Sequence, residues 1–146
     1  MNLPFKGTGK IVYDPFRAGM KAKTDWWVVI EVDKEITRYY RWWLNYQFGL
    51  ILDAPAWDAH CSVVRSERPK PGTEHLWKKL HGKTIDIDFG HIVKNAPSKP
   101  EFWYIDAYAP EIDEIRNDFG LKTFHDYHIT VAKSKFEQFP VMRHFI

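Results

Sequence analysis

The chain contains little cysteine and no long hydrophobic run, and both absences narrow its class. Cys61 is the one cysteine among 146 residues, so an internal disulfide is excluded. The most apolar stretch, at 26–32, ends at Asp33 and falls short of the roughly 18 residues that a membrane helix needs. The opening residues, MNLPFKGTGK, lack the apolar core of a secretory signal. We therefore expect a soluble, cytoplasmic protein with no membrane partner.

A strong charge of one sign is also missing. The net charge is +2, from 21 basic and 19 acidic residues. A protein that grips duplex DNA by its phosphates is normally more basic, so we expect no duplex DNA partner. Aromatic residues reach 16%, which suits a pocket for a small nucleotide and an ordinary aromatic core equally well. The length predicts a single domain over residues 1–146.

Local patterns predict an α+β domain of strands and helices. Runs rich in β-branched and aromatic residues predict strands at 9–14, 26–32, 59–65, 83–89, 102–108 and 127–133. Apolar residues at three-to-four spacing predict a helix at 34–47, with Asp33 as its N-cap and Gly49 just past its end. Shorter helices are expected at 73–80 and 110–119. A hairpin partner at 91–94 is expected across Gly90.

The sequence contains an internal repeat between segments 26–65 and 102–133. Phe-Gly-Leu follows each of the two main helices, and the hexad Asp-x-His-x-(Ser/Thr)-Val ends each half, at 58–63 and 126–131. Three residues recur at one constant offset: Trp27, Glu35 and Ile36 match Trp103, Glu111 and Ile112. The repeat predicts a two-lobed, pseudo-symmetric fold with antiparallel sheets flanked by helices. The two closing strands are expected side by side, with both hexads facing a central cleft.

The hexads carry the residues for phosphodiester chemistry. Side chains at i and i+2 on a strand share a face, so His60 lies with Ser62, and His128 with Thr130. A neutral imidazole accepts a proton from an attacking oxygen, and a protonated one donates to the departing oxygen. Imidazole suits both roles because its ordinary pKa is near 6.5. The hydroxyls donate to the phosphate oxygens. These four residues are the predicted catalytic set, and the chemistry requires no metal and no cofactor.

The paired His-x-(Ser/Thr) motifs resemble those of the 2H phosphoesterase superfamily. That superfamily includes RNA 2′,3′-cyclic phosphodiesterases and phage enzymes that degrade cyclic oligonucleotide immune signals. The segments KIVYDPFRAGMKAKTDWW, DKEITRYYRWW, WDAHCSVVR and YHITVAK are similar, more closely, to phage proteins described as Swiss Army Knife RNA repair-like. The resemblance implies a 2H phosphoesterase-like fold and a metal-independent phosphodiesterase acting on a nucleotide or short RNA. A phage-encoded member would work in the host cytoplasm.

Six further side chains are predicted to contact the substrate by stacking or through positive charge: Tyr13, Arg17, Lys23, Arg65, Phe124 and Lys133. Tyr13 and Phe124 are candidate platforms for a base. Arg65 and Lys133 each follow their motif histidine by five positions. On a regular strand this odd offset turns them away from the motif, whereas a bulge would return them to its face as phosphate ligands.

Other functions stay open at this point. His125 and His128 are spaced H-x-x-H and Cys61 adjoins a motif histidine, but a zinc site needs more ligands at other spacings, so we expect no metal. A module that sequesters a nucleotide or RNA end without cleaving it fits the same motifs. A protein-binding surface built from the aromatics is a third reading. The sequence assigns neither the acid and base roles nor an oligomeric state.

Overall fold

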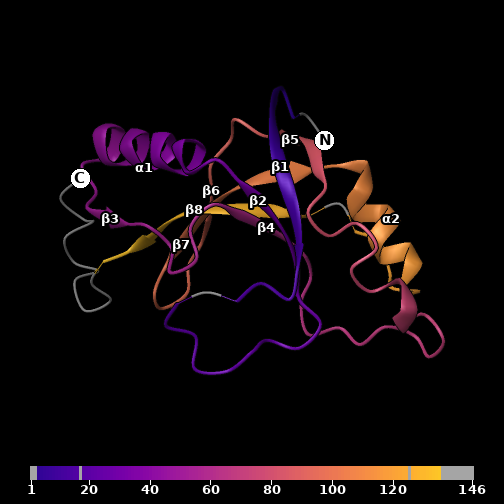
Figure 1. Cartoon of the computed structure of the whole chain (residues 1–146). Helices are drawn as coiled ribbons and strands as arrows, with labels where there is room; N and C mark the ends of the chain where they lie inside the picture. The colour runs from indigo at the N-terminus through magenta and orange to yellow at the C-terminus, as the bar shows by residue number, and fades with distance from the viewer. Residues whose placement is uncertain (1–2, 17, 125, 136–146) are drawn as a thin grey trace.

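The computed structural model describes residues 3–16, 18–124 and 126–135, which are mostly strands (Figure 1). In chain order the strands are β1 (Phe5–Tyr13), β2 (Val28–Val32), β3 (Leu52–Asp53), β4 (His60–Val64), β5 (Thr84–Phe89), β6 (Lys94–Ala96), β7 (Phe102–Tyr108) and β8 (His128–Ser134). The α-helices are α1 (Lys34–Phe48) and α2 (Pro110–Asp118), and Glu74–Leu76 forms a 3-10 turn.

Six of these strands close into an antiparallel barrel. The order around the ring is β8, β4, β2, β1, β5 and β7, and the pairing of β7 with β8 closes it. In that closing pair Ile105 is the Cα partner of Ile129. Outside the ring, β3 pairs with the end of β8 and β6 with the start of β7. Strands from both halves of the chain thus share one barrel.

The two-lobed α+β fold expected from the repeat is therefore wrong. The described residues form a closed barrel with two short helices, not two helix-flanked lobes around a central cleft. Each half contributes three strands to the ring, and three strands alone would leave two unpaired edges. The pairings β1 with β5 and β4 with β8 use those edges to join the halves.

Alternation along the strands separates the inside of the barrel from its outer face. Fully buried side chains from all six strands fill the inside: Ile11, Ile30, Cys61, Ile87, Ile105 and Ile129. The helices α1 and α2 lie on opposite sides of the barrel (Figure 1). They bury Tyr40 and Leu44 from α1, and Ile112 and Ile115 from α2. The outer face of β4 and β8 is where the motif side chains lie.

The strongest local predictions are confirmed, and two weaker ones are wrong. Helix α1 follows the predicted 34–47, with the Asp33 carboxylate accepting from the Glu35 amide and Gly49 at φ 63°. The expected helix at 73–80 is only a 3-10 turn that stops at Leu76, because the backbone is extended at Trp77, with ψ 130°, and left-handed at Lys78, with φ 74°. The expected hairpin partner at 91–94 is also wrong. Both edges of β5 are already taken by β1 and β7, so β6 pairs with β7 instead.

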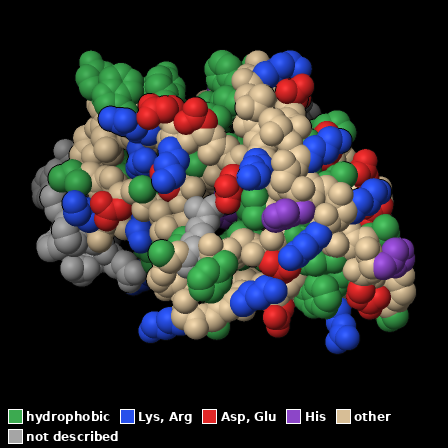
Figure 2. All heavy atoms as spheres, in the orientation of Figure 1, with side chains coloured by type: hydrophobic (Ala, Val, Ile, Leu, Met, Phe, Trp, Pro, Cys, Tyr) green, Lys and Arg blue, Asp and Glu red, His purple; other side chains and the backbone are tan. Residues whose placement is uncertain are grey.

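The face of the molecule seen in Figure 2 mixes charges of both signs with hydrophobic side chains. Three aromatic rings of α1 are among the most exposed: Tyr39, Trp42 and Tyr46. Over the described residues, the helices are too short or too polar to span a membrane.

Candidate active site

The two motifs lie side by side on adjacent antiparallel strands. Cys61 in β4 is the Cα partner of Ile129 in β8. Both side chains are fully buried inside the barrel, so the residues on either side of them face outward. Continuing the register by one residue each way sets each histidine opposite the other motif's hydroxyl: His60 opposite Thr130, and His128 opposite Ser62. The two histidines are diagonal neighbours in this pair, and such residues lie about 7–8 Å apart, with their Cβ atoms somewhat closer.

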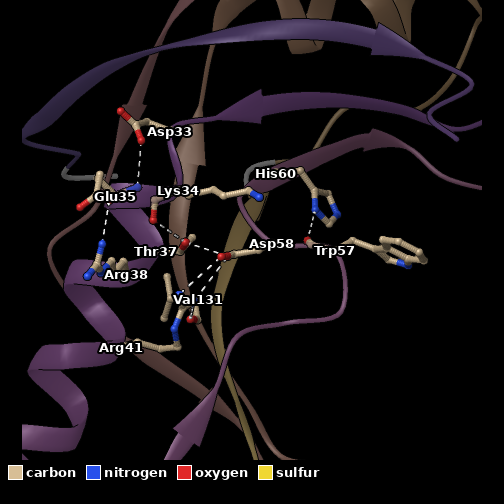
Figure 3. A network of polar contacts seen from close by, with 10 residues as sticks. All are labelled: Asp33, Lys34, Glu35, Thr37, Arg38, Arg41, Trp57, Asp58, His60 and Val131. Atoms are coloured by element: carbon tan, nitrogen blue, oxygen red, sulfur yellow. Dashed lines mark hydrogen bonds and ion pairs between the residues drawn. The ribbon is translucent and has the colours of Figure 1, made fainter. Parts of the chain in front are cut away.

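His60 is held in one orientation. Its Nδ1 lies 2.7 Å from the backbone carbonyl of Trp57 (Figure 3). A carbonyl only accepts, so Nδ1 carries the proton and the neutral ring has its lone pair on Nε2. The half-buried ring also meets the Trp27 indole edge to face, with centroids 5.9 Å apart. The structure thus fixes the tautomer that a general base requires.

His128 is exposed and more loosely held. Its Nδ1 lies 3.5 Å from the Asp126 carbonyl, at the outer limit for a hydrogen bond. The Tyr104 ring packs against it with centroids 5.0 Å apart. On β7, Asp106 is the Cα partner of His128, and its carboxylate lies 2.8 Å from the Lys94 ammonium.

The two hydroxyl residues are both half-buried on the same face. The Trp27 indole N–H donates to Ser62 Oγ over 3.1 Å. Because that bond uses an acceptor position, the Ser62 hydroxyl proton can still be directed at a phosphate oxygen. Thr130 is the Cα partner of Tyr104 on β7.

Each motif strand contains a bulge directly after its hydroxyl residue. On β4 the partner of Val29 is Ser62 and the partner of Val28 is Val64, which leaves Val63 as the extra residue. On β8 the partner of Tyr104 is Thr130 and the partner of Trp103 is Ala132, which leaves Val131 as the extra residue. A bulge shifts the alternation of the strand by one position. The repeat therefore extends to an irregularity at the same place in both motifs.

These bulges return the two predicted phosphate ligands to the outer face. The Arg65 guanidinium lies 5.2 Å from the centre of the Trp27 ring, whose N–H binds Ser62. Lys133 is the Cα partner of Phe102, which shares a strand face with Tyr104. Arg65 follows one end of the four-residue cluster and Lys133 the other, so positive charge stands at both ends of the site.

The other side chains predicted to contact the substrate lie away from the motifs or already contact other protein groups. Tyr13 is only 2% exposed, its ring packs on Trp77 at 5.2 Å, and burial raises its pKa to about 12. A ring buried in the core cannot stack on a base, so Tyr13 is removed from the site. Lys23 pairs with Asp14 at 3.4 Å, directly after β1. Phe124 is exposed at one side, and the Arg116 guanidinium covers its ring at 4.5 Å. Arg17 lies outside the described residues.

A polar network that the sequence did not predict ties α1 to the first motif (Figure 3). The Thr37 hydroxyl donates to Asp58 Oδ1 over 2.7 Å, and the Arg41 guanidinium pairs with Asp58 Oδ2 at 3.4 Å. Asp58 precedes His60 by two residues and adjoins Trp57, whose carbonyl orients that histidine. The aspartate that both hexads share was the available signal, because it marks a polar group two residues before each motif histidine.

Two other chemistries, a cysteine nucleophile and a bound metal ion, can be compared with the structure. Cys61 is fully buried, and burial raises the pKa of its thiol to about 12, so it is not a nucleophile paired with His60. Within residues 3–16, 18–124 and 126–135, no three His, Cys, Asp or Glu side chains gather closely enough to hold a metal ion.

No known protein is found to be similar to this chain. No protein-family model matches the chain, and no significant match is found among the curated proteins or the solved structures.

Proposed function

We propose that this protein is a phosphodiesterase that uses two histidines as acid and base to cleave nucleotide phosphodiesters next to a ribose hydroxyl. The observation that supports it most is the register of β4 on β8, which gathers two histidines and two hydroxyls on one face. The proposal includes a relationship to the 2H phosphoesterases. The paired His-x-(Ser/Thr) motifs support this relationship, and the expected two-lobed fold does not. The expected substrates are a nucleotide or short RNA in the cytoplasm, or in the host cytoplasm if a phage encodes the protein.

We assign the base to His60 and the acid to His128. The Trp57 carbonyl keeps the His60 proton on Nδ1, so Nε2 accepts the proton of the attacking oxygen. With an RNA 2′,3′-cyclic phosphate, water attacks phosphorus, one ring P–O bond breaks, and the departing ribose oxygen takes a proton from His128. With a cyclic oligonucleotide, the 2′-hydroxyl attacks its neighbouring phosphate. The bond to the 5′-oxygen breaks, and that oxygen takes the same proton.

The surrounding donors match the negative charge that develops on the non-bridging phosphate oxygens. Ser62 and Thr130 lie diagonally across the site, each opposite the other motif's histidine. Their hydroxyls can donate to two non-bridging oxygens, where negative charge grows in the transition state. Arg65 and Lys133 stand beyond the two ends and suit further phosphates of a nucleotide chain.

The test is incubation in EDTA with two groups of substrates, cyclic di- and trinucleotides and short RNAs ending in a 2′,3′-cyclic phosphate. Products are resolved by mass spectrometry. Cleavage by wild-type protein that is lost in the His60→Ala/His128→Ala variant supports the proposal, and the reacting group identifies the substrate. Cleavage that depends on a metal, or that survives in the double variant, contradicts it. Ligand that is bound and recovered intact would favour a sequestering module instead.

A further inference from the structure

Two arginines, one half-buried and one fully buried, connect the helices to the motif strands. Arg41 comes from α1, in the first half of the chain, and its side chain is 15% exposed. Arg116 comes from α2, in the second half, and its side chain is 1% exposed. Arginine is rarely withdrawn from water unless its donors are used, so their partners show what the two side chains do.

Each arginine binds the bulge of the opposite half. Arg41 Nη1 donates to the Val131 carbonyl over 2.8 Å, and Arg116 Nη1 donates to the Val63 carbonyl over 2.9 Å. These valines are the extra residues of the two bulges, where the ladder is interrupted, and both are buried. A buried carbonyl without a donor is destabilising, so the arginines stabilise the bulged form of each strand.

Arg41 also holds the segment that leads into the other motif. Its guanidinium contacts both carboxylate oxygens of Asp58, each at 3.4 Å, and Thr37 shares that carboxylate (Figure 3). Asp58 lies between Trp57, which orients the His60 ring, and His60 itself. One side chain therefore joins the bulge of the second motif to the support of the first histidine.

Arg116 makes the corresponding link in the other direction. Its Nε donates to the Lys122 carbonyl over 2.6 Å, and its guanidinium covers the Phe124 ring, both in the segment before His128. Two further bonds of 2.8 and 2.7 Å reach the two carboxylate oxygens of Glu67. Arg116 therefore joins the bulge of the first motif to the segment that leads into the second histidine.

We propose that Arg41 and Arg116 are crossed positioning residues, which together set how His60 and His128 face one another. Each fixes one motif through its bulge and the other through the segment before its histidine. The same contacts keep the bulges that turn Arg65 and Lys133 toward the site. The inference rests on the proposed phosphodiesterase function for its kinetic effect, but the geometry of the histidines can be measured without a substrate.

The kinetic experiment replaces each arginine by lysine. A lysine keeps the positive charge but lacks the planar fork that serves a carboxylate and a carbonyl together. We expect Arg41→Lys and Arg116→Lys each to lower kcat about 10- to 100-fold on the reacting substrate, with KM changed less than about threefold. The matched control is Arg38→Lys, an exposed arginine one turn earlier in α1 that pairs with Glu35, and it should leave both constants unchanged.

Two milder variants keep the test decisive if a lysine variant does not fold. Thr37→Val removes the hydroxyl bond to Asp58, and Glu67→Gln weakens the partner of Arg116, while both arginines stay in place. Each should lower kcat in the same direction by a smaller factor. The proposal would be overturned if the folded lysine variants and the folded Thr37→Val and Glu67→Gln variants all kept the wild-type kcat.

The substrate-free readout is nitrogen NMR of the imidazoles, which reports the tautomer of each histidine. In wild-type protein the His60 ring should be protonated at Nδ1. In Arg41→Lys this signature should weaken because Asp58 no longer anchors the Trp57 carbonyl. Unchanged imidazole signals in folded Arg41→Lys would refute positioning, whatever the substrate. Changed imidazole signals in a protein that cleaves none of the substrates would instead support the positioning role of the arginines and refute the proposed phosphodiesterase function.

Discussion

The two motifs agree in sequence, register and bulge, yet their histidines are held very differently. The His60 ring is half-buried, bonds the Trp57 carbonyl at 2.7 Å and follows an aspartate anchored by α1. The His128 ring is exposed, with its Nδ1 contact at 3.5 Å, and follows an exposed Asp126. A repeated sequence thus sets which side chains meet, while unrepeated neighbours decide how firmly each is held. An acid and a base need different surroundings, so this asymmetry agrees with the roles proposed for the two histidines.

The largest expected effect is the loss of either histidine. His60→Ala and His128→Ala should each lower turnover by about 10²–10⁴, the usual contribution of a general acid or base. His60→Ala should also lower the melting temperature more than His128→Ala does, because the half-buried His60 ring bonds the Trp57 carbonyl at 2.7 Å whereas the His128 ring is exposed. Turnover assays with thermal unfolding check both points, and His91→Ala, at another exposed histidine, is the control. Retained activity in either variant would remove that histidine from the mechanism.

The hydroxyl residues should separate catalysis from stability. Ser62→Ala and Thr130→Ala should each reduce kcat by about 10²–10³ if they stabilise charge in the transition state. Ser62→Ala also leaves the buried Trp27 N–H without its acceptor, which costs about 1–3 kcal/mol of unfolding free energy. Urea unfolding should show that difference. Equal stability of the two variants would mean that the indole bond contributes nothing.

The cations at the two ends should act on binding more than on chemistry. Arg65→Ala and Lys133→Ala should each raise KM about 10-fold or more, the effect of losing one hydrogen bond to a charged group. The effect should shrink at high salt. Lys135→Ala removes a lysine that pairs with Asp53 near the end of β8, and it is the control. A normal KM in Lys133→Ala would show that this bulge does not bring its lysine to the substrate.

The smallest expected effect is a pH dependence of stability at Glu67. The hydrogen bonds from Arg116 lower the pKa of this carboxyl in the folded protein. Its stabilisation is therefore complete above the unfolded pKa of about 4.3 and is lost as the pH falls through the lower folded value. Glu67→Gln should melt earlier than wild type at neutral pH, and the gap should narrow in acid. Glu35→Gln, at an exposed carboxylate, controls for the charge change. A gap that is constant with pH would contradict the assigned cause.

The parts of the fold that sequence predicted are those with a local cause. Helix α1 has its cap, spacing and terminal glycine within one segment, and strand β7 matches its predicted 102–108. Closure of β7 on β8 depends on pairing between distant segments, which alternation cannot specify. The bulges at Val63 and Val131 lie in ordinary β-branched runs with no glycine to mark them.

In the candidate site, too, features with a local cause were predictable and features that depend on distant segments were not. Alternation correctly grouped His60 with Ser62, because neighbours on one strand are a local matter. Tyr13 was misjudged because its strand is buried by residues that come much later, among them Trp77. The roles of Arg41 and Arg116 were invisible, since each binds a carbonyl of the other half.

Strand β8 has a consequence for how the protein is made. It forms ladders with β3, β4 and β7, so it completes the barrel and brings the second motif to the first in a single event. Ribosomes add about 5–20 residues per second, so for some seconds the nascent chain exposes the unpaired edges of β4 and β7. During that interval the candidate site is incomplete and the chain is prone to aggregate. The complete site and a soluble barrel should therefore appear together, when β8 leaves the ribosome and inserts.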